Sequence, residues 1–327
     1  MTTTKAPNAA NTTFGKLFTA EMLDHILDMV LTGKAPWQKP WDSAKCGGII
    51  SPRNAASGHR YRGGNILALA MMQEMMGYES FGWMTFNQAK KKGYFVRKGE
   101  KSSKVVFWSK ITGKKKDDES GNEDAGYTGM FARQYSVFNV DQLSDADGNP
   151  VDLCRPILDA QQEWEDDAYA DAIINATGVV IKEGGDKAAY SPNLNLVKMP
   201  PKPAFSDSAG YYATLFHEVT HATMHPSRCN RDGSGHGFGT VGYAKEELVA
   251  EIGSWMLALA LGVPFNPQHS ASYLENWSSL FPTRDEKILA LNTAFQKAEQ
   301  AVSWIEQKAI DAGLIQHQEE GELQEAA

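Results

Sequence analysis

Apolar residues recur about once per helical turn in several stretches of this chain. Between residues 14 and 31, the series Leu17, Met22, Leu23, Ile26, Leu27 and Val30 predicts an amphipathic helix that ends before Gly33. Similar patterns predict helices over 65–76, 85–92, 157–177, 209–225, 244–261, 273–280 and 284–312. Runs of β-branched and aromatic residues predict strands over 104–108, 130–140, 179–181 and 190–199.

The order of these elements predicts an α+β chain with two domains. A small α+β domain is expected over residues 14–141, with a solvated insertion at 113–129 inside a hairpin. Residues 142–156 contain Asp-Gly-Asn-Pro and are expected to link it to a second domain over 157–312. We expect residues 1–13 to be disordered and residues 313–327 to form a polar, acidic tail.

The composition narrows the class of protein. The 327 residues are 42% hydrophobic, which is enough for ordinary cores. No run of 18 apolar residues occurs and the N-terminus is polar, so neither a transmembrane helix nor a secretory signal is expected. The three cysteines are far apart and form neither a disulfide framework nor a CxxC motif. The expected compartment is therefore the reducing cytosol.

The net charge of −8 conceals two halves of opposite sign. Residues 1–112 carry 16 Lys and Arg against 7 Asp and Glu, whereas residues 142–327 carry 12 against 27. A basic first half is typical of a surface that meets a polyanion. The asymmetry predicts two modules with different partners, so fragments 1–141 and 150–327 are expected to fold separately, the first binding DNA and the second metal.

Residues 217–221 read His-Glu-Val-Thr-His inside a predicted helix. His217 and His221 are four residues apart, so they lie on one helix face and can bind one ion together. Zinc prefers imidazole nitrogens, and a catalytic zinc keeps one position open for water. Glu218 follows the first histidine and can reach that water as a general base. The alternative interpretation is a solvated helix face with this spacing by chance.

The next helix offers a third ligand. Glu247 and Glu251 are again four residues apart, on a helix that is otherwise largely apolar. Two carboxylates directed at a core are costly unless a cation meets them. Glu247 is predicted as the third ligand and Glu251 as the carboxylate that orients a ligand histidine, although the swapped assignment stays open. Tyr243 is a possible oxyanion group that either polarises a substrate carbonyl or simply packs.

Two further features bear on this site. His225 and His236 are interpreted as loop residues and not as ligands. An extended peptide needs an exposed sheet edge beside the metal helix. The predicted strand that runs from Asn193 to Met199 ends at Pro200 and Pro201, which favours an edge position for it.

Several motifs in this order resemble a known family. These are Phe216 to Ala222, His225 to Arg231, Tyr243 to Glu251 and Tyr273 to Trp277 in the second half, with Pro36 to Trp41, Gly58 to Asn65, Trp83 to Ala89, Val96 to Lys101 and Phe138 to Gln142 in the first. Together they resemble ArdC-type antirestriction proteins. The resemblance implies an N-terminal single-stranded-DNA-binding domain followed by a zincin-like metallopeptidase domain, over about residues 14–312.

The residues of the first half are compatible with DNA binding. Single-stranded DNA is bound by a basic groove that carries aromatic stacking platforms. The predicted DNA-binding residues are Trp37, Trp41, Arg53, Arg60, Tyr61, Arg62, Trp83, Phe86, Lys90, Lys91, Arg97, Lys98, Lys101 and Lys104. For each single aromatic residue, a place in the core is the alternative. No phosphate-binding loop motif with its lysine occurs, so nucleotide use is not implied.

The residues together with this resemblance imply a cytosolic antirestriction protein that coats incoming single-stranded plasmid DNA during conjugation. Its second domain is predicted to be a zinc-dependent peptidase-like domain that acts on or docks a host protein such as a subunit of a restriction system, with Mn²⁺ or Co²⁺ as other possible metals. The alternative is a pure DNA-binding protein whose metal site is structural or vestigial. Neither prediction includes a membrane partner.

Overall fold

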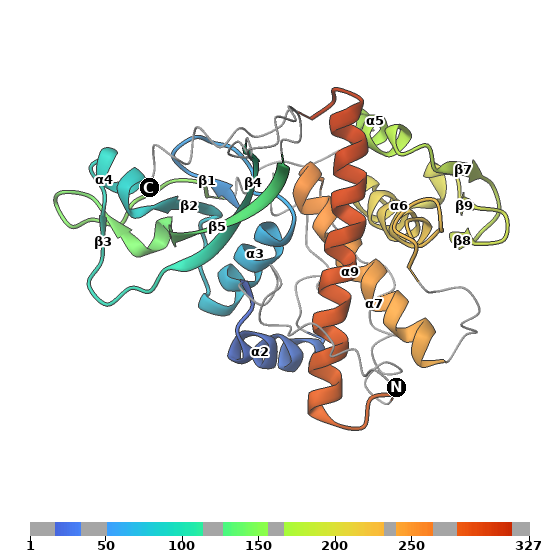
Figure 1. The fold of residues 1–327 in the computed structure, drawn as a ribbon, viewed down its shortest axis with the longest axis horizontal. Coiled ribbons are helices and arrows are strands. Elements are labelled where there is room, and N and C mark those ends of the chain that lie inside the picture. Colours follow the sequence, from blue (N-terminus) through green and yellow to red (C-terminus); the bar gives the residue numbers. More distant parts are fainter. Residues whose placement is uncertain are drawn as a thin grey trace, which may run out of the picture.

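The structure, a computed structural model, describes residues 17–33, 51–113, 127–155, 167–231, 240–263 and 280–315. Figure 1 shows the long helix α9 (Arg284–Asp311) standing between two groups of elements. On one side lie α2 (Ala20–Leu31), α3 (Gly64–Met76) and the N-terminal strands. On the other side lie α5 (Ala168–Ala176), α6 (Ser208–Ala222) and a small sheet. The α+β class predicted from the sequence is confirmed.

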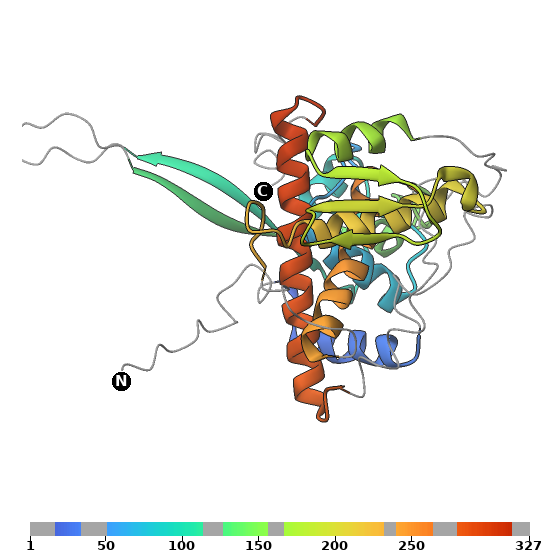
Figure 2. The same cartoon turned by 90° about the vertical axis from the view of Figure 1, so that its right-hand side faces the viewer.

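The N-terminal part is built on a four-stranded sheet. Its strand order is β1 (Arg53–Asn54), β2 (Gly82–Thr85), β5 (Tyr127–Asn139) and β4 (Ser103–Gly113). β1 and β2 run parallel, whereas the other neighbours are antiparallel. Both hairpin strands are longer than predicted, and Figure 2 shows the β4–β5 hairpin extending away from the rest of the molecule. Most of the predicted insertion lies outside the described residues.

The end of β2 leads directly into a short helix. The side chain of Thr85 accepts a hydrogen bond from the N–H of Gln88, and the backbone N–H of Thr85 donates to the side-chain oxygen of Gln88, so α4 (Phe86–Lys91) begins with a capping box. After α4, β3 (Phe95–Val96) pairs with β6 (Leu143–Ser144). This segment places the basic residues from 90 to 101 on one small unit beside the sheet.

Residues 142–155 do not form the predicted linker. They follow the short turn η3 (Val140–Gln142), and β6 belongs to the N-terminal part. Leu143 and Val151 are buried in a cluster with Met84 and Ala89. The Asp-Gly-Asn-Pro sequence makes a turn within this unit, where the N–H of Asp145 donates to the carbonyl of Asn149. Turn-forming residues therefore marked a compact loop and not a domain boundary.

A three-stranded sheet precedes α6. The strand order is β7 (Val180–Glu183), β9 (Leu196–Met199) and β8 (Ala189–Ser191). The predicted single strand over 190–199 is two antiparallel strands joined by a turn, where Asn195 takes a φ of 48°. β9 is therefore the central strand, and the prediction of an edge strand from Asn193 to Met199 is wrong. The prolines follow β9 and lead into η4 (Lys202–Ala204), so they leave its pairing intact.

One hydrophobic core connects the two halves of the chain. Residues of α2 and α3 belong to the same buried cluster as residues of α6, α7 (Val241–Leu261) and α9. Phe18, just before α2, stacks on Phe295 of α9 with ring centroids 5.2 Å apart. The smaller clusters around Trp83 and Met84 belong mainly to the N-terminal part. The chemical site described next therefore lies on helices whose packing also includes the N-terminal helices.

Candidate metal centre

Helix α6 carries the two histidines of the HExxH motif. It begins after Asp207, whose carboxylate accepts a hydrogen bond from the N–H of Gly210, and it ends at Ala222, four residues before Pro226. His217 and His221 are one turn apart on the same face, and their rings meet edge to face with centroids 4.7 Å apart. The prediction that this motif lies on a helix is confirmed.

Helix α7 packs closely along α6 and supplies the carboxylates. Gly253 makes this close approach possible, because a Cβ atom there would lie 2.6 Å from Cγ2 of Thr220 on α6. The side chain of Thr240 caps the first turn of α7. Glu246, Glu247 and Glu251 all lie on this buried helix, and Glu247 reaches between the two histidines. A short helix-to-helix distance is therefore what brings the third donor to the HExxH face.

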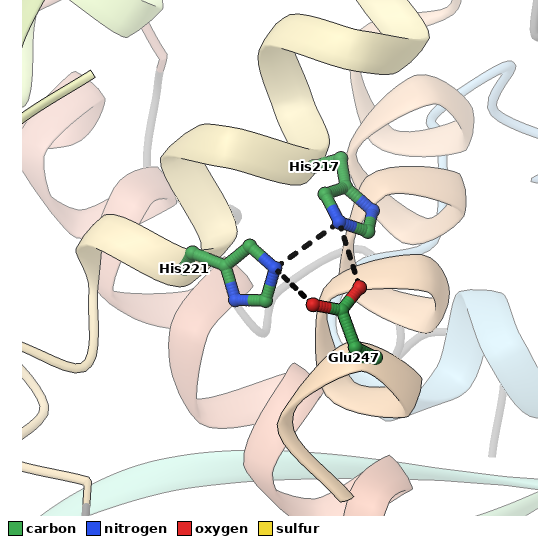
Figure 3. Close-up of side chains that lie close together, drawn as sticks. All are labelled: His217, His221 and Glu247. Carbon is green, nitrogen blue, oxygen red and sulfur yellow. Dashed lines mark hydrogen bonds and ion pairs between the residues drawn. The ribbon is translucent and has the colours of Figure 1, made fainter. Parts of the chain in front are cut away.

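The three side chains converge on one point, as Figure 3 shows. The Nε2 atoms of His217 and His221 are 3.1 Å apart. The carboxylate oxygens of Glu247 lie 3.5 Å from Nε2 of His217 and 3.6 Å from Nε2 of His221. Ligand atoms about 2.0–2.1 Å from one tetrahedral zinc ion are about 3.3 Å from each other. The spacing and the chemistry of these donors thus fit a single divalent ion.

A second carboxylate lies behind each imidazole. Oε1 of Glu251 is 3.8 Å from Nδ1 of His217, where the sequence predicted an orienting group. Oε1 of Glu246 is 3.5 Å from Nδ1 of His221. Glu246 and its partner Arg231 are not among the site residues predicted from the sequence, although the Glu-Glu doublet at 246–247 is a signal that includes both carboxylates. Of the two assignments left open, this geometry favours Glu247 as ligand and Glu251 as orienting group.

Glu218 lies beside this cluster and is tied to the small sheet. It is buried, and its Oε2 accepts a hydrogen bond of 2.6 Å from the backbone N–H of Tyr190 on β8. Its negative charge is close enough to contribute to the raised pKa of both histidines. In the part of the chain that the structure describes, β8 is an edge strand of its sheet. The structure thus brings a candidate base, a sheet edge and the donor cluster together.

Without a metal ion, the histidines hold protons strongly. Burial opposes protonation of His221, but the nearby carboxylates of Glu246 and Glu247 outweigh it and raise the pKa of His221 to about 10. Burial likewise opposes protonation of His217, but Glu247 and Glu251 raise its pKa as well. The same ion pairs lower the pKa of Glu247, although burial alone would raise it. At neutral pH a metal ion must therefore displace at least one proton from this cluster.

Metal affinity is expected to rise steeply with pH. Both raised pKa values mean that the imidazoles are protonated below them, and only a neutral imidazole binds metal. Each proton released makes binding about tenfold tighter per pH unit, up to the pKa of the displaced group. The number of protons released is measured by calorimetric titration of the metal-free protein with Mn²⁺ or Zn²⁺, repeated in two buffers of different ionisation enthalpy. Release of no proton at pH 7 would contradict the ion-paired state described here.

The remaining predicted residues of this site are less directly placed. Tyr243 is half-buried in the first turn of α7, four residues before Glu247, so it shares a helix face with that carboxylate. Nδ1 of His225 lies 2.7 Å from the hydroxyl of Ser227 in the turn after α6, in keeping with a loop residue. His236 lies outside the described residues.

Two of the predicted stacking residues are buried. Trp83 has 0% of its surface exposed and Tyr61 has 3%, and both belong to the core cluster of the N-terminal sheet. Neither side chain can stack on a base in this conformation, so the alternative left open for single aromatics applies to them. For Trp83 the neighbouring residues do not reveal its burial, because β2 is buried along its whole length and shows no alternation of buried and exposed positions. Trp37 and Trp41 lie outside the described residues.

The predicted DNA-binding loop around Arg60 instead joins the two halves. The guanidinium of Arg60 donates to the carbonyl of Ala260 at the end of α7, at 3.3 Å. It also covers Gly262, where a Cβ atom would lie 2.5 Å from an Arg60 nitrogen and where φ is +78°. The N–H of Gly64 donates to Glu299 of α9 at 2.9 Å. Arg60 is thus a contact between the halves, and Arg62 nearby is half-buried.

Other predicted DNA-binding residues are exposed. Phe86 at the start of α4 shows 55% of its surface, and Phe95 on β3, which the sequence analysis did not select, shows 54%. Exposed basic side chains surround this unit at Lys90, Lys91, Arg97, Lys98, Lys101 and Lys104. Arg97 donates to the carbonyl of Asp141 and pairs with Glu100, whereas Lys104 donates to Ser136. Arg53 lies over the ring of Phe81 at 4.8 Å.

Comparison with protein families divides the chain into two matched regions. Residues 16–138 match the N-terminal domain of the anti-restriction factor ArdC, and residues 168–294 match a zincin-like metallopeptidase family. Crystal structures of the antirestriction protein ArdC from plasmid R388 are similar at a TM-score of 0.60 and 33% identity. The metal-free form is covered over 97% of its length and the Mn(II)-bound form over 98%, each with 89% of this chain.

Longer relatives share the same region. Two DNA primases named TraC from Escherichia coli are 33% identical over 314 residues and 32% identical over 300. Those matches include 92% and 90% of this chain, which spans only 28% and 20% of the length of the two primases. An uncharacterized protein of Sinorhizobium fredii is 33% identical over 317 residues, with 95% of this chain and 97% of that protein matched.

Among the described residues, no helix is both long enough and apolar enough to cross a membrane.

Proposed function

This chain belongs to the ArdC family of antirestriction proteins, and we propose that it protects incoming plasmid DNA by two activities. The N-terminal part would bind single-stranded DNA without sequence preference. The second part would be a metallopeptidase that acts on a protein of the recipient cell, such as a subunit of a restriction system. The observation that carries the second activity is the convergence of His217, His221 and Glu247 beside the buried Glu218.

Each residue of the site has a distinct role in this proposal. His217, His221 and Glu247 would hold the ion, which supplies a Lewis acid for the scissile carbonyl and lowers the pKa of water. The Glu218 carboxylate would accept a proton from the attacking water and deliver it to the departing amine. Because β8 is an edge strand beside Glu218, it offers main-chain groups to an extended peptide. Tyr243 would face the substrate oxygen from the first turn of α7.

The donor set supports zinc as the preferred ion. Two imidazoles and one carboxylate are a common ligand set of catalytic zinc. The same set also accepts Mn²⁺ or Co²⁺, and the R388 relative has been solved with Mn(II). The second candidate function is binding of single-stranded DNA alone, with a metal site that is structural. The core shared by the two halves supports this candidate.

A chelator experiment tests the proposed activity. Purified full-length protein is incubated with candidate host restriction subunits, with and without a chelator, and intact substrate is followed with time. We expect cleavage of a restriction subunit with the metal-loaded protein, loss of cleavage with chelator and recovery when Zn²⁺ or Mn²⁺ is added back. Cleavage at the same rate with and without chelator would argue against a metal-dependent peptidase. Absence of cleavage under all conditions would favour the pure DNA-binding function.

The proposed DNA face lies on α4, β3 and the turn that follows β3. It joins the exposed Phe86 and Phe95 to the exposed lysines of the same unit. Unstacked bases stack on exposed aromatic rings, and lysines neutralise phosphates. This placement replaces the buried Trp83 and Tyr61 as stacking platforms and keeps, of the predicted basic residues, Lys90, Lys91, Arg97, Lys98 and Lys101.

The salt dependence of binding is expected to separate these two contributions. Replacing Lys90, Lys98 and Lys101 together by Ala should weaken binding and flatten the log–log salt slope by about 2, at about 0.7 per phosphate contact. Replacing Phe86 by Ala should cost about 1–3 kcal/mol and leave the slope unchanged. Fluorescence anisotropy with a labelled oligonucleotide at several salt concentrations measures both.

A triple variant of the second half is the matched control. Lys182, Lys187 and Lys198 are also exposed, so their replacement by Ala removes the same charge far from the proposed face. This control should retain the affinity and the slope of the original protein. Equal losses in the two triple variants would mean that only net charge matters and that α4 and β3 form no DNA face.

A further inference from the structure

A buried ion pair lies directly behind one of the proposed metal ligands. The side chain of Arg231, only 2% exposed, donates to both carboxylate oxygens of Glu246, at 2.5 Å to Oε1 and 3.3 Å to Oε2. Its remaining donors contact the carbonyl of Thr220 at 2.9 Å and the hydroxyl of Thr223. A guanidinium without solvent needs such a full set of partners. Arg231 therefore joins the end of α6 to the second turn of α7.

Glu246 passes this constraint on to His221. Its Oε1, which binds Arg231, is also the oxygen 3.5 Å from Nδ1 of His221. Nδ1 of His221 is buried and has no hydrogen bond of ordinary geometry, and this carboxylate oxygen is the acceptor that faces it at 3.5 Å. A carboxylate behind Nδ1 favours the tautomer whose Nε2 lone pair points away from it. That Nε2 atom is the one that faces His217 and Glu247 in Figure 3.

The arrangement has no simple explanation in packing alone. Glu246 and Glu247 are adjacent on one helix and both are buried, Glu246 near His221 and Glu247 near both histidines. Two neighbouring buried carboxylates repel each other, and each needs a cation. Arg231 neutralises Glu246 and holds its carboxylate in one orientation, which leaves Glu247 as the carboxylate available to an ion. Because of Arg231, the two glutamates differ: Glu246 is already paired with a cation, whereas Glu247 can bind a metal ion.

We infer that Arg231 is a positioning residue that acts through Glu246 to hold His221 in the orientation needed to bind the metal ion. This inference rests on the proposed metal site and adds two residues to it. Groups that orient a ligand histidine typically contribute 10-fold to 100-fold to metal affinity. Arg231 is not expected to contact the substrate. Its replacement should therefore change metal affinity directly and any activity only through the metal.

The test measures metal affinity of full-length variants by competition with a chromogenic chelator, using Zn²⁺ and Mn²⁺. Arg231→Met and Glu246→Gln should each bind 10-fold to 100-fold more weakly than the original protein. The double variant should be no weaker than the weaker single variant, because both changes break one chain of contacts. The absorption spectrum of bound Co²⁺ should also change in both, since it reports the geometry of the ligands.

Arg228→Met is the matched control. Arg228 lies in the same turn and donates to Asn195 and to the carbonyl of Ala222. Its replacement should leave metal affinity and the Co²⁺ spectrum unchanged. Arg231→Lys keeps the positive charge but lacks the planar guanidinium that binds both carboxylate oxygens. It should restore only part of the metal affinity that is lost in Arg231→Met.

The outcomes separate the inference from the function on which it rests. If the original protein binds no divalent ion, the proposed metal site itself fails. If the original protein binds the ion and a folded Arg231→Met variant binds it within about threefold, Arg231 serves stability only and the inference is wrong. Should Arg231→Met fail to fold, the isosteric Glu246→Gln decides the question alone, because unchanged affinity in that variant equally overturns it.

Discussion

Replacing Glu218 by Gln is expected to slow hydrolysis of the protein substrate by about 10²-fold to 10⁴-fold, the usual contribution of a general base. Gln has the same shape as Glu, and its side-chain oxygen can still accept the hydrogen bond from the N–H of Tyr190. The variant loses only the carboxylate that takes up the proton of the attacking water. Initial rates of cleavage of a restriction subunit at saturating metal measure this effect.

Two further measurements distinguish loss of chemistry from loss of structure. Metal content should stay that of the original protein, because the three converging donors are those of His217, His221 and Glu247. Single-stranded-DNA binding should also be retained. Glu183→Gln on β7 is the matched control, since that side chain is exposed and the chemical change is the same. It should cleave at the original rate.

The same variant separates the two proposed functions in cells. If proteolysis protects the transferred DNA, Glu218→Gln should reduce plasmid transfer into a restricting host to the level seen without the protein. If occupancy of single-stranded DNA is sufficient, transfer should be unaffected by Glu218→Gln and should fall with the triple lysine variant of the DNA face. Survival of full protection in Glu218→Gln would rule out the enzymatic account of protection.

Local pattern was sufficient for the part of the site that lies on single helices. His217 and His221, like Glu247 and Glu251, are pairs whose shared face follows from helix geometry alone. The predicted helices match α6, α7 and α9 to within a few residues at their ends. These features depend only on residues near one another in the chain.

Features that depend on tertiary packing could not be predicted in the same way. The roles of Glu246 and Arg231 arise from the register of α7 against α6 and from the turn that returns Arg231 to that interface. The central place of β9 is set by strand order, which alternation within one strand does not reveal. Trp83 is of a residue type that commonly stacks on bases. However, the whole of β2 is buried, so the ring of Trp83 fills the core.

The charge asymmetry predicted two modules, whereas the packing joins them. Separate partners require only separate surfaces, and the surfaces of the two halves do differ in charge. Beneath those surfaces, α2 and α3 share one core with α7 and α9. Arg60 and Glu299 add polar contacts across the same junction. Charge along a chain thus says nothing about how its core is divided.

A fragment of residues 1–141 is accordingly expected to be unstable, in contrast to the expectation from charge alone. In the full chain α2 buries Met22, Leu23, Ile26, Leu27 and Val30, and α9 is a main partner of this helix. Each such side chain loses about 1.5–3 kcal/mol when it returns to water. Five of them together amount to about 7.5–15 kcal/mol, which is comparable with the total of about 5–15 kcal/mol that stabilises an ordinary domain. The fragment should therefore aggregate or lack a cooperative urea transition.

Variants of the full chain test the same shared core without truncation. Phe18→Ala removes the ring that stacks on Phe295 and should lower the free energy of unfolding by about 3–5 kcal/mol. Leu31→Ala is the matched control at the exposed end of α2 and should change it by less than about 0.5 kcal/mol. Urea titrations followed by far-ultraviolet circular dichroism and by tryptophan fluorescence should give coincident transitions for the original protein, because one core connects both halves. A soluble fragment of residues 1–141 that unfolds cooperatively, together with a Phe18→Ala variant as stable as the original, would show instead that the N-terminal part folds independently of α9.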